Sequence, residues 1–364
     1  MVNWLLIIAA AAITSAMCFR ANYVADRFKL FDYPRGGRKH HVAPTPQVGG
    51  LAIFLPLALW LLVESAVGSQ DPFYRATLLS AGGVALVGVM DDQSHLSPGL
   101  RLVLLADFAL IAFALDSSLA APAIHWASFG PTTLPVWLFV SLAVIAIAGF
   151  VSSVNMADGI DGLVPSLFLI WCMAYVAFGD GAVRQLAIVL TGPVAILLVF
   201  NLRGKVFLGD CGTFGLGFVF SLMAIASLRS GKISAETLLV WYFIPVVDCL
   251  RVIATRLIAG RSPLKGGKDH FHHMLAEALG KRLAFYVYAV LVLVTSIIAA
   301  LFPRSGTVLL IALAGVCLGF VIAKAAVERR TLPGVEGRGQ PATNPVAKTV
   351  ANLAHPRANR STKI

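Results

Sequence analysis

Long runs of apolar residues recur along this chain of 364 residues. A helix needs about 20 consecutive apolar residues to cross the roughly 30 Å hydrocarbon core of a bilayer, and these runs are close to that length. Hydrophobic residues make up 58% of the chain and charged residues only 13%, whereas about a quarter of the residues in an average soluble domain are charged. The sequence therefore predicts an all-α fold, a polytopic integral membrane helix bundle.

Eleven apolar runs are long enough, or nearly so, to be transmembrane helices. Two of them, 76–90 and 102–118, are short, so they are either re-entrant segments or helices that continue into their flanking turns. The eleven spans are predicted at residues 3–19, 48–66, 76–90, 102–118, 134–154, 163–179, 182–201, 211–228, 236–257, 283–302 and 306–326.

Lysines and arginines are distributed unequally between alternate loops. Of the 29, 24 fall on the side that includes residues 20–47, 251–282 and the C-terminal segment, and five fall on the other side. Basic residues near helix ends are retained in the cytoplasm. We therefore expect the N-terminus outside and the C-terminus in the cytoplasm. Attraction to anionic lipid headgroups explains most of the net charge of +11, and we expect no nucleic-acid partner.

The chain is expected to contain one membrane domain and one tail. No basic residue precedes the first apolar run, which indicates a retained helix rather than a cleaved signal peptide. Residues 1–328 are predicted to form the membrane domain. Residues 329–364 are rich in Gly, Pro and basic residues and are predicted to be a disordered cytoplasmic tail. The five cysteines show no CxxC spacing, so neither a disulfide framework nor a zinc site is indicated.

Nearly all clusters of polar residues fall in loops that are predicted to be cytoplasmic. The loops of the other side contain only scattered polar residues. We therefore predict one cytoplasmic site assembled from five loops. The five clusters are "GRKHHVAPTPQVGG" (37–50), "MDDQSHLSPGLR" (90–101), "NMADGIDGL" (155–163), "NLRGKVFLGDCGT" (201–213) and "GRSPLKGGKDHFHHML" (260–275).

Five aspartates stand at the predicted inner ends of the spans, where a carboxylate is costly and usually functional. They are Asp91, Asp92, Asp158, Asp161 and Asp210. Carboxylate oxygens suit Mg²⁺ or Mn²⁺, and Mg²⁺ in particular completes its coordination shell with water and substrate phosphates. The carboxylates therefore imply a substrate that carries phosphate.

Asn155, Asp158 and Asp161 follow one another at intervals of three, which would place them on one face of a helix. Gly159 and Gly162 would allow a ligand to approach the backbone closely, or the helix to end irregularly. This pattern favours a nucleotide lying across the end of a helix. A plain cytoplasmic turn is the alternative interpretation.

Asp91 and Asp92 are adjacent, so both can face one ligand only if the helix end is bent. The Ser-Pro-Gly sequence at 97–99 indicates a break there. One carboxylate of the pair could instead cap the next helix at its positive N-terminus, and the sequence does not decide between these interpretations.

Basic and histidine side chains in the same loops can neutralise phosphates. The histidines of "DHFHH" are spaced so that they could also bind a metal, but no cysteine lies close to them in sequence. Binding of a phosphate or a sugar is therefore favoured. The candidates are Lys39, His41, Lys205, Arg261, His270, His272 and His273.

In this order, the clusters resemble the motifs of the polyprenyl-phosphate N-acetylaminosugar-1-phosphate transferases, a family of the glycosyltransferase 4 type. "RKHHVAPTPQVGGLAIF" is similar to the first cytoplasmic motif, "DDQSHLSPGLRL" to the aspartate-pair motif, "NMADGIDGL" to the nucleotide-site motif and "FLGDCGT" to the metal motif. The last cluster resembles the branch that uses UDP-N-acetylglucosamine or a related sugar, because the muramyl-pentapeptide branch typically has three consecutive histidines.

The resemblance implies an Mg²⁺-dependent enzyme of the bacterial inner membrane with its active site on the cytoplasmic face. It would transfer N-acetylglucosamine 1-phosphate from a UDP-sugar to undecaprenyl phosphate and release UMP, the first step of a surface polysaccharide such as O antigen, common antigen or capsule. The muramyl-pentapeptide transferase of peptidoglycan synthesis is the alternative. A secondary transporter, with polar residues at mid-membrane, is the remote one. A homodimer is compatible with such a bundle, but the sequence indicates no interface.

The resemblance also implies a role for each candidate residue. Asp210, with Asp92, would bind the metal, while Asp91 and Asp92 would position or deprotonate the lipid phosphate, which we expect to attack directly. Attack by an aspartate on phosphorus, which would give a phospho-enzyme, is the alternative, and the sequence does not decide between the two. Three features depart from the family pattern: His95 stands where a third acidic residue is common, the stretch from Asn201 to Asp210 is one residue shorter than usual, and Cys211 and Thr213 stand where a small residue and Ser are common. The implied substrate-binding residues are Lys39, His41, Asn155, Asp158, Asp161, Asn201, Lys205, Arg261, His270, His272 and His273.

Overall fold

The computed structural model describes residues 4–34, 43–66, 71–120, 123–258, 260, 262, 267 and 269–331, with side chains up to residue 319 and at 322, and the structural statements below concern these residues. The chain divides into two compact units, Met1–Gly315 and Val316–Ile364. The predicted tail, 332–364 of which lies outside the described residues, falls within the second unit, so its boundary at residue 328 stays a prediction.

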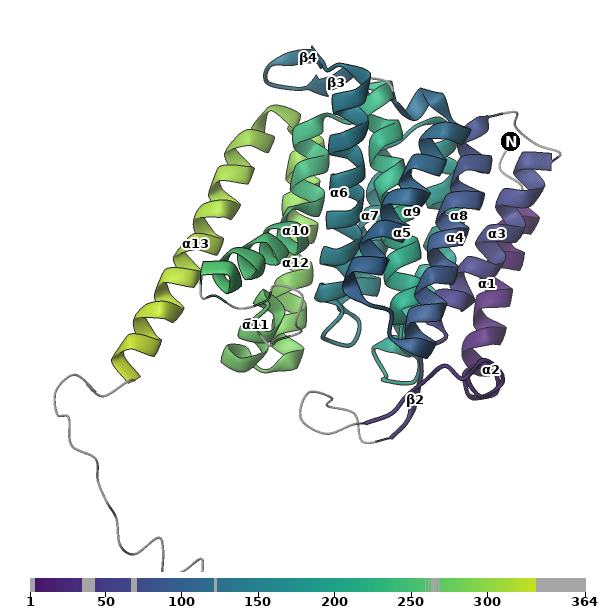
Figure 1. Cartoon of the computed structure of the whole chain (residues 1–364), viewed down its shortest axis with the longest axis horizontal. Coiled ribbons are helices and arrows are strands. Elements are labelled where there is room, and N and C mark those ends of the chain that lie inside the picture. Colours follow the sequence, from purple (N-terminus) through teal and green to yellow (C-terminus); the bar gives the residue numbers. More distant parts are fainter. Residues whose placement is uncertain are drawn as a thin grey trace, which may run out of the picture. The chain divides into compact units, whose positions relative to one another are not determined.

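Helices dominate the described chain, and two short antiparallel strand pairs complete it (Figure 1). The strands are β1 (Phe31–Asp32), β2 (Thr45–Pro46), β3 (Ala123–Trp126) and β4 (Gly130–Thr133). The helices are α1 (Trp4–Phe19), α2 (Ala21–Phe28), α3 (Gly49–Ala66), α4 (Pro72–Ser94), α5 (Pro98–Leu115), α6 (Val136–Ala157), α7 (Leu163–Phe178), α8 (Gly181–Asn201), α9 (Gly209–Ser230), α10 (Ala235–Ile258), α11 (Phe271–Leu279), α12 (Lys281–Leu301) and α13 (Gly306–Thr331), with the 3-10 turns η1 (Ser117–Ala120) and η2 (Pro303–Ser305).

Each of the eleven predicted spans coincides with a helix. Eight described helices are long and apolar enough to cross a membrane, and the pair α1 and α2, bent by 76°, makes up to nine. Helix α7 and the segment Pro303–Gly319 are apolar but shorter. The structure therefore supports a polytopic helical membrane protein, whereas the count of eleven and the orientation of the termini stay predictions. The two short runs belong to the longer helices α4 and α5, so their flanking turns extend them.

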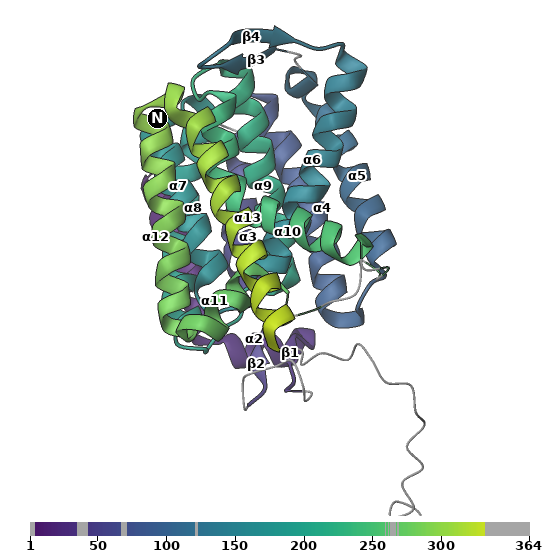
Figure 2. The ribbon, with the colours of Figure 1, turned by 90° about the vertical axis from the view of Figure 1, so that its left-hand side faces the viewer.

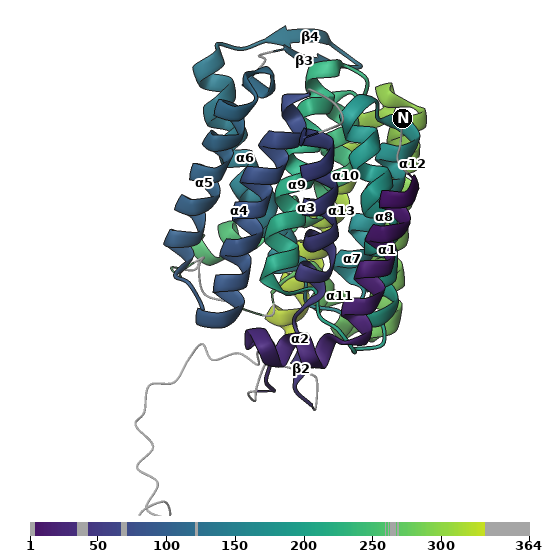
Figure 3. The same cartoon turned by 90° about the vertical axis from the view of Figure 1, so that its right-hand side faces the viewer.

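Helix α9 lies at the centre of the first unit, packed against α3, α4 and α6 (Figure 3). Its apolar window is 83% buried, compared with 22% for α5. Glycines make this close packing feasible, because a Cβ on Gly50 of α3 would collide with the backbone of Gly212, and one on Gly88 of α4 would collide with the backbone of Asp210. On another side of the bundle, α12 packs against α7, α10 and α11 (Figure 2).

Helix α10 contains Pro245, which cannot donate a hydrogen bond to the carbonyl of Trp241 one turn earlier. Inside a membrane no water can replace that bond, so the carbonyl needs another donor. The indole Nε1 of Trp171 on α7 donates to the Trp241 oxygen at 2.9 Å. The proline thereby leaves the Trp241 carbonyl free to accept a hydrogen bond from α7, and this bond joins α7 to α10.

The same solution appears at Pro56 inside α3. The carbonyl left free by this proline belongs to Ala52, and the Thr14 hydroxyl of α1 donates to it at 2.8 Å. Two neighbouring helices are thus joined through a backbone oxygen that a regular helix would have used internally.

The two ends of the first unit differ in structure. At the hairpin end, β3 and β4 pair in register from Ala123 opposite Thr133 to Trp126 opposite Gly130. The buried carboxylate of Glu236, in the first turn of α10, accepts hydrogen bonds from the backbone N–H groups of Ala127 (2.9 Å) and Ser128 (3.0 Å) and so holds the hairpin turn. The other end carries α2, β1, β2 and α11 (Figure 1), and we call it the cavity end.

The variant Trp171→Phe is expected to lose about 1–3 kcal/mol of stability, because it leaves the Trp241 carbonyl buried without a donor. Thermal unfolding in detergent measures this loss. Trp60→Phe is the matched control, since the indole Nε1 of the buried Trp60 has no hydrogen-bond partner among the described residues. Equal melting temperatures for the two variants would contradict the role of the Trp171 hydrogen bond.

Candidate active site

A cavity of about 850 Å³ lies at the cavity end of the bundle. It is lined by the end of α6 and the following turn, the end of α8, the start of α9, α11, the start of α12, and residues beside β1 and β2. The structure thus brings residues from four of the five predicted clusters to one place. The sequence-predicted residues that line it are Asn155, Asp158, Asp161, Asn201, Asp210 and His273.

The segment "NMADGIDGL" is a helix end followed by a turn. Helix α6 ends at Ala157, so the prediction that Asn155, Asp158 and Asp161 share a helical face was wrong. Gly162, with φ of +84°, starts α7 in a backbone conformation that other residues rarely adopt. The turn nevertheless brings the carboxylates of Asp158 and Asp161 to the cavity, because it links the end of α6 to the start of α7 there.

The two glycines of this turn are also places of close contact. A Cβ on Gly159 would collide with the imidazole of His272, and a Cβ on Gly162 would collide with the side chain of Leu202. A larger residue at either position would therefore displace the side chain of His272 or of Leu202.

The N-terminus of α9 is held by two side chains from other helices. Asp92 of α4 accepts hydrogen bonds from the backbone N–H groups of Asp210 (2.9 Å) and Cys211 (3.1 Å). Asn155 of α6 donates from Nδ2 to Asp210 Oδ1 at 2.6 Å and to Thr213 Oγ1 at 3.0 Å. A carboxylate is a favourable partner for the unpaired N–H groups of a helix N-terminus. Asp92 therefore caps α9, a helix distant in sequence, rather than the next helix.

Asp91 is fully buried and has its own structural partners. Its Oδ1 accepts the backbone N–H of Leu96 at 2.7 Å, and its Oδ2 forms an ion pair with Arg101 Nε at 2.9 Å. The predicted break is confirmed, since α4 ends at Ser94, His95 adopts φ of +53° and Ser97 caps α5. Asp91 does not line the cavity, so its predicted catalytic role stays a prediction.

Asn201, at the end of α8, joins two loops. Its Oδ1 accepts the backbone N–H of Gly162 at 2.5 Å, and its Nδ2 donates to the carbonyl of Val206 at 2.9 Å. Lys205 lies on the intervening turn, exposed and away from the cavity lining. The structure thus shows Asn201 shaping the cavity through the backbone, while its predicted contact with substrate stays a prediction.

The three histidines of the last cluster lie close together but differ in their surroundings. His270 Nδ1 lies 2.9 Å from Asp248 Oδ2, His272 is buried beside Gly159, and His273 lines the cavity. Burial lowers the pKa of His272 to about 3, with contributions from His273 and His270, so this ring is neutral at physiological pH. Three further sequence-predicted residues, Lys39, His41 and Arg261, lie outside the described residues.

Several residues that line the cavity were not predicted from the sequence. Lys281 and Arg282 begin α12, which follows α11 after one residue. A basic pair at the predicted inner end of a span was a signal that could have found them. The aromatic residues had no distinguishing signal in a chain so rich in apolar residues. The unpredicted lining residues include Asp32, Gln47, Phe207, Lys281, Arg282, Phe285 and Tyr286.

Carboxylates are concentrated where the turn after α6 and the start of α9 line the cavity. Burial, together with the neighbouring carboxylates of Asp161 and Asp92, raises the pKa of Asp158 to about 7. Carboxylates this close together repel one another, and a cation or a hydrogen-bond donor bound in the cavity would relieve that repulsion. Among the described residues, no three His, Cys, Asp or Glu side chains converge closely enough to hold a metal ion by themselves. A divalent cation here would therefore share its shell with a ligand.

Comparisons with known proteins agree with this arrangement. A family model described as glycosyl transferase family 4 matches residues 74–228. The chain is 29% identical over 278 residues to an undecaprenyl-phosphate alpha-N-acetylglucosaminyl 1-phosphate transferase of Yersinia pestis, covering 72% of this chain and 74% of that protein. It is 27% identical over 302 residues to a decaprenyl-phosphate N-acetylglucosaminephosphotransferase of Mycobacterium leprae, covering 74% and 75%. The resemblance that the motifs indicate is confirmed.

The variant Asp92→Asn is expected to melt at a lower temperature than the natural protein, with a loss of about 1–3 kcal/mol, because an amide places N–H donors against the N–H groups of α9. Asp158→Asn is the matched control, since within the described residues the Asp158 carboxylate accepts no hydrogen bond. An Asp92→Asn protein as stable as Asp158→Asn would contradict the capping of α9.

The raised pKa of Asp158 also predicts a pH dependence of stability. Its ordinary pKa is 3.8 and its pKa in the fold is about 7, so between these values the folded protein retains a proton that the unfolded chain has released. The free energy of unfolding should therefore fall as the pH rises from about 4 to about 7 and should change little from this cause above that range. Thermal unfolding without ligand should show this fall, and Asp158→Asn should reduce it. An identical pH dependence in the variant would contradict the prediction.

Proposed function

We propose that this chain transfers N-acetylglucosamine 1-phosphate from UDP-N-acetylglucosamine to undecaprenyl phosphate and releases UMP. Its resemblance to glycosyl transferase family 4 is confirmed over residues 74–228. One observation carries the proposal: a cavity lined by four aspartates lies at the end of an apolar helix bundle, where a polar nucleotide sugar and a membrane-anchored phosphate can meet. The names of the relatives from Yersinia pestis and Mycobacterium leprae support this reaction.

The location and the pathway are part of the proposal. A multi-pass protein of the bacterial inner membrane with its cavity on the cytoplasmic face would have access to cytoplasmic UDP-sugars and to lipid phosphate in the inner leaflet. The product, a lipid-linked sugar diphosphate, would start a surface polysaccharide such as O antigen, common antigen or capsule. The distribution of basic residues supports this orientation.

The residues at the start of α9 fit a divalent cation that is held in part by substrate. Asp210 lines the cavity, and Asp92 lies against its backbone N–H. Mg²⁺ commonly takes one or two carboxylates and completes its shell with phosphate oxygens and water. Asp210 would be the principal ligand and Asp92 the second, and Mn²⁺ could replace Mg²⁺. Bound there, the cation would neutralise charge on the diphosphate and on the departing UMP.

The acceptor needs little help from a base. The second pKa of a phosphate monoester is about 6, so the lipid phosphate is largely dianionic at neutral pH and can attack the sugar-bearing phosphorus directly. Asp91 and Asp92 would then act mainly by fixing the inner end of α4 and the start of α9, which bears Asp210. The main obstacle is repulsion between two anions, and the cation together with Lys281 and Arg282 would lower it.

The remaining residues of the cavity would bind the donor. Asp158 and Asp161 accept hydrogen bonds from uracil or ribose, which the crowding of their carboxylates favours. His273, on α11, lines the cavity beside Gly159 of the same turn and is placed to contact the sugar or its phosphate. Asn155 orients the Asp210 carboxylate through its amide.

A transfer assay tests the proposal. Purified protein receives labelled UDP-N-acetylglucosamine, UDP-N-acetylgalactosamine or UDP-muramyl-pentapeptide with undecaprenyl phosphate, in Mg²⁺ or in EDTA. We expect lipid product and UMP in equal amounts from N-acetylglucosamine in Mg²⁺, no product in EDTA, and a loss of about 100-fold or more in Asp210→Asn.

The controls separate the alternatives. Product from the muramyl-pentapeptide donor alone would assign the chain to peptidoglycan synthesis. Folded protein, verified by its melting curve, that gives no product with any donor would overturn the proposed function. Activity that persists in EDTA would overturn the metal assignment while leaving the transfer reaction intact.

A further inference from the structure

Helix α10 carries a buried carboxylate, Asp248, in a segment that is otherwise apolar enough to span a membrane. Its side chain is 8% exposed and forms an ion pair with Arg251, one turn later on the same helix, at 2.7 Å. Removing a carboxylate from water costs several kcal/mol unless its oxygens are paired. The buried Asp248 carboxylate therefore needs partners beyond Arg251, and these partners lie outside α10.

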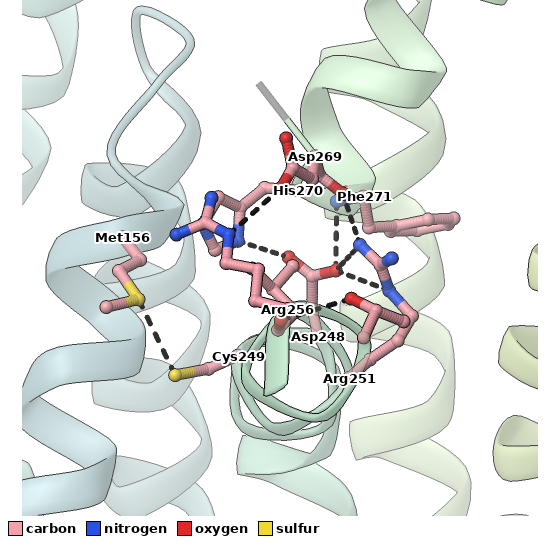
Figure 4. A network of polar contacts seen from close by, with 10 residues as sticks. Met156, Asp248, Cys249, Arg251, Arg256, Asp269, His270 and Phe271 are labelled. Carbon is pink, nitrogen blue, oxygen red and sulfur yellow. Dashed lines mark hydrogen bonds and ion pairs between the residues drawn. The ribbon is translucent and has the colours of Figure 1, made fainter. Parts of the chain in front are cut away.

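The Asp248–Arg251 pair binds the histidine segment, residues 269–273, at three points. Asp248 Oδ1 accepts the backbone N–H of Phe271 at 2.9 Å, and Asp248 Oδ2 lies 2.9 Å from His270 Nδ1. Arg251 Nη2 donates to the carbonyl of Asp269. Figure 4 shows these contacts around one carboxylate and one guanidinium. The start of α11 is thus fixed by side chains of α10.

A second ion pair holds the same segment from the side. Arg256 Nε lies 3.0 Å from Asp269 Oδ2, but the Asp269 side chain is 44% exposed, so this pair is weakened by solvent. The Sγ of Cys249 lies 3.6 Å from the Sδ of Met156 at the end of α6 (Figure 4). Helix α10 therefore holds the histidine segment beside the turn that carries Asp158.

The three rings form a connected row from Asp248 to the cavity. The His270 and His272 rings are nearly parallel, with centroids 5.8 Å apart and planes at 9°. The centroids of His272 and His273 are 4.1 Å apart. A carboxylate at Nδ1 places the shared proton on that nitrogen and fixes the orientation of the ring. A shift of His270 would therefore displace its two neighbours, of which His273 lines the cavity.

We infer that Asp248 is a positioning residue of the active site, which aligns His272 and His273 with the donor-binding turn by fixing His270 and the backbone of residues 269–271. The inference rests on the proposed function, because the cavity is taken as the donor site. Asp248 itself does not line the cavity, so it acts through the histidines and touches no substrate. A misplacement of about 1 Å at a reacting centre can cost about 100-fold in rate.

The variant Asp248→Asn tests the inference, with Glu236→Gln as the matched control. Glu236 is a buried carboxylate of the same helix that likewise binds backbone N–H groups of another segment, two in its case and one in that of Asp248, but it lies at the hairpin end. Both variants are expected to lower the melting temperature. Below that temperature, Asp248→Asn should lower kcat/KM for the UDP-sugar about 10- to 100-fold while the KM for undecaprenyl phosphate stays unchanged, and Glu236→Gln should retain natural kinetics.

A double variant shows whether Asp248 acts through His270. His270→Phe keeps an aromatic ring but removes both ring nitrogens, and Asp248→Asn with His270→Phe should be no slower than the slower single variant. Losses that multiply in the double variant would overturn the inference.

Chemical modification gives a readout that does not depend on turnover. Diethyl pyrocarbonate followed by mass spectrometry should leave His270 and His272, which are 6% and 1% exposed, unmodified in the natural protein and in Glu236→Gln. Both should react in Asp248→Asn. Unchanged protection together with unchanged kinetics in that variant would overturn the inference, whereas natural protein that transfers no sugar would overturn the proposed function instead.

Discussion

The interior of a bilayer offers no water to the backbone, so each backbone N–H and C=O group inside the bundle needs a partner supplied by the protein. Prolines in α3 and α10 free one carbonyl each, and Thr14 and Trp171 from neighbouring helices donate to them. The same requirement governs the start of α9, where Asp92 accepts two backbone N–H groups. Unpaired backbone groups thus decide which helices are joined and where.

The candidate site is built from groups that also serve structural needs. Asp210 reaches the cavity because Asp92 and Asn155 hold the first turn of α9. Asn201 holds the turn that carries Asp158 and Asp161 through the N–H of Gly162. Under the proposed function, activity lost on mutating Asp92 would have two sources, loss of a proposed metal ligand and displacement of Asp210. Measurements of stability and of rate on the same variants separate them.

Much of this arrangement could be predicted from the sequence, because hydrophobic run length and clustered carboxylates are local signals. All eleven apolar runs proved to be helices, and residues of four predicted clusters line one cavity. Partners distant in sequence could not be predicted. Capping of α9 by Asp92 spans 118 positions, and the bond between His270 and Asp248 spans 22. The helical face expected for Asp158 and Asp161 failed because α6 ends at Ala157.

Helix α10 carries one buried carboxylate in its first turn, Glu236 at the hairpin, and another near its middle, Asp248 at the histidine segment. Each accepts at least one backbone N–H of a segment outside the helix. Sliding α10 by a single turn, about 5.4 Å, would break both attachments at once. The helix therefore has one axial register. A force applied to the β3–β4 hairpin would be transmitted along α10 to the histidines, because the helix cannot slide to absorb it.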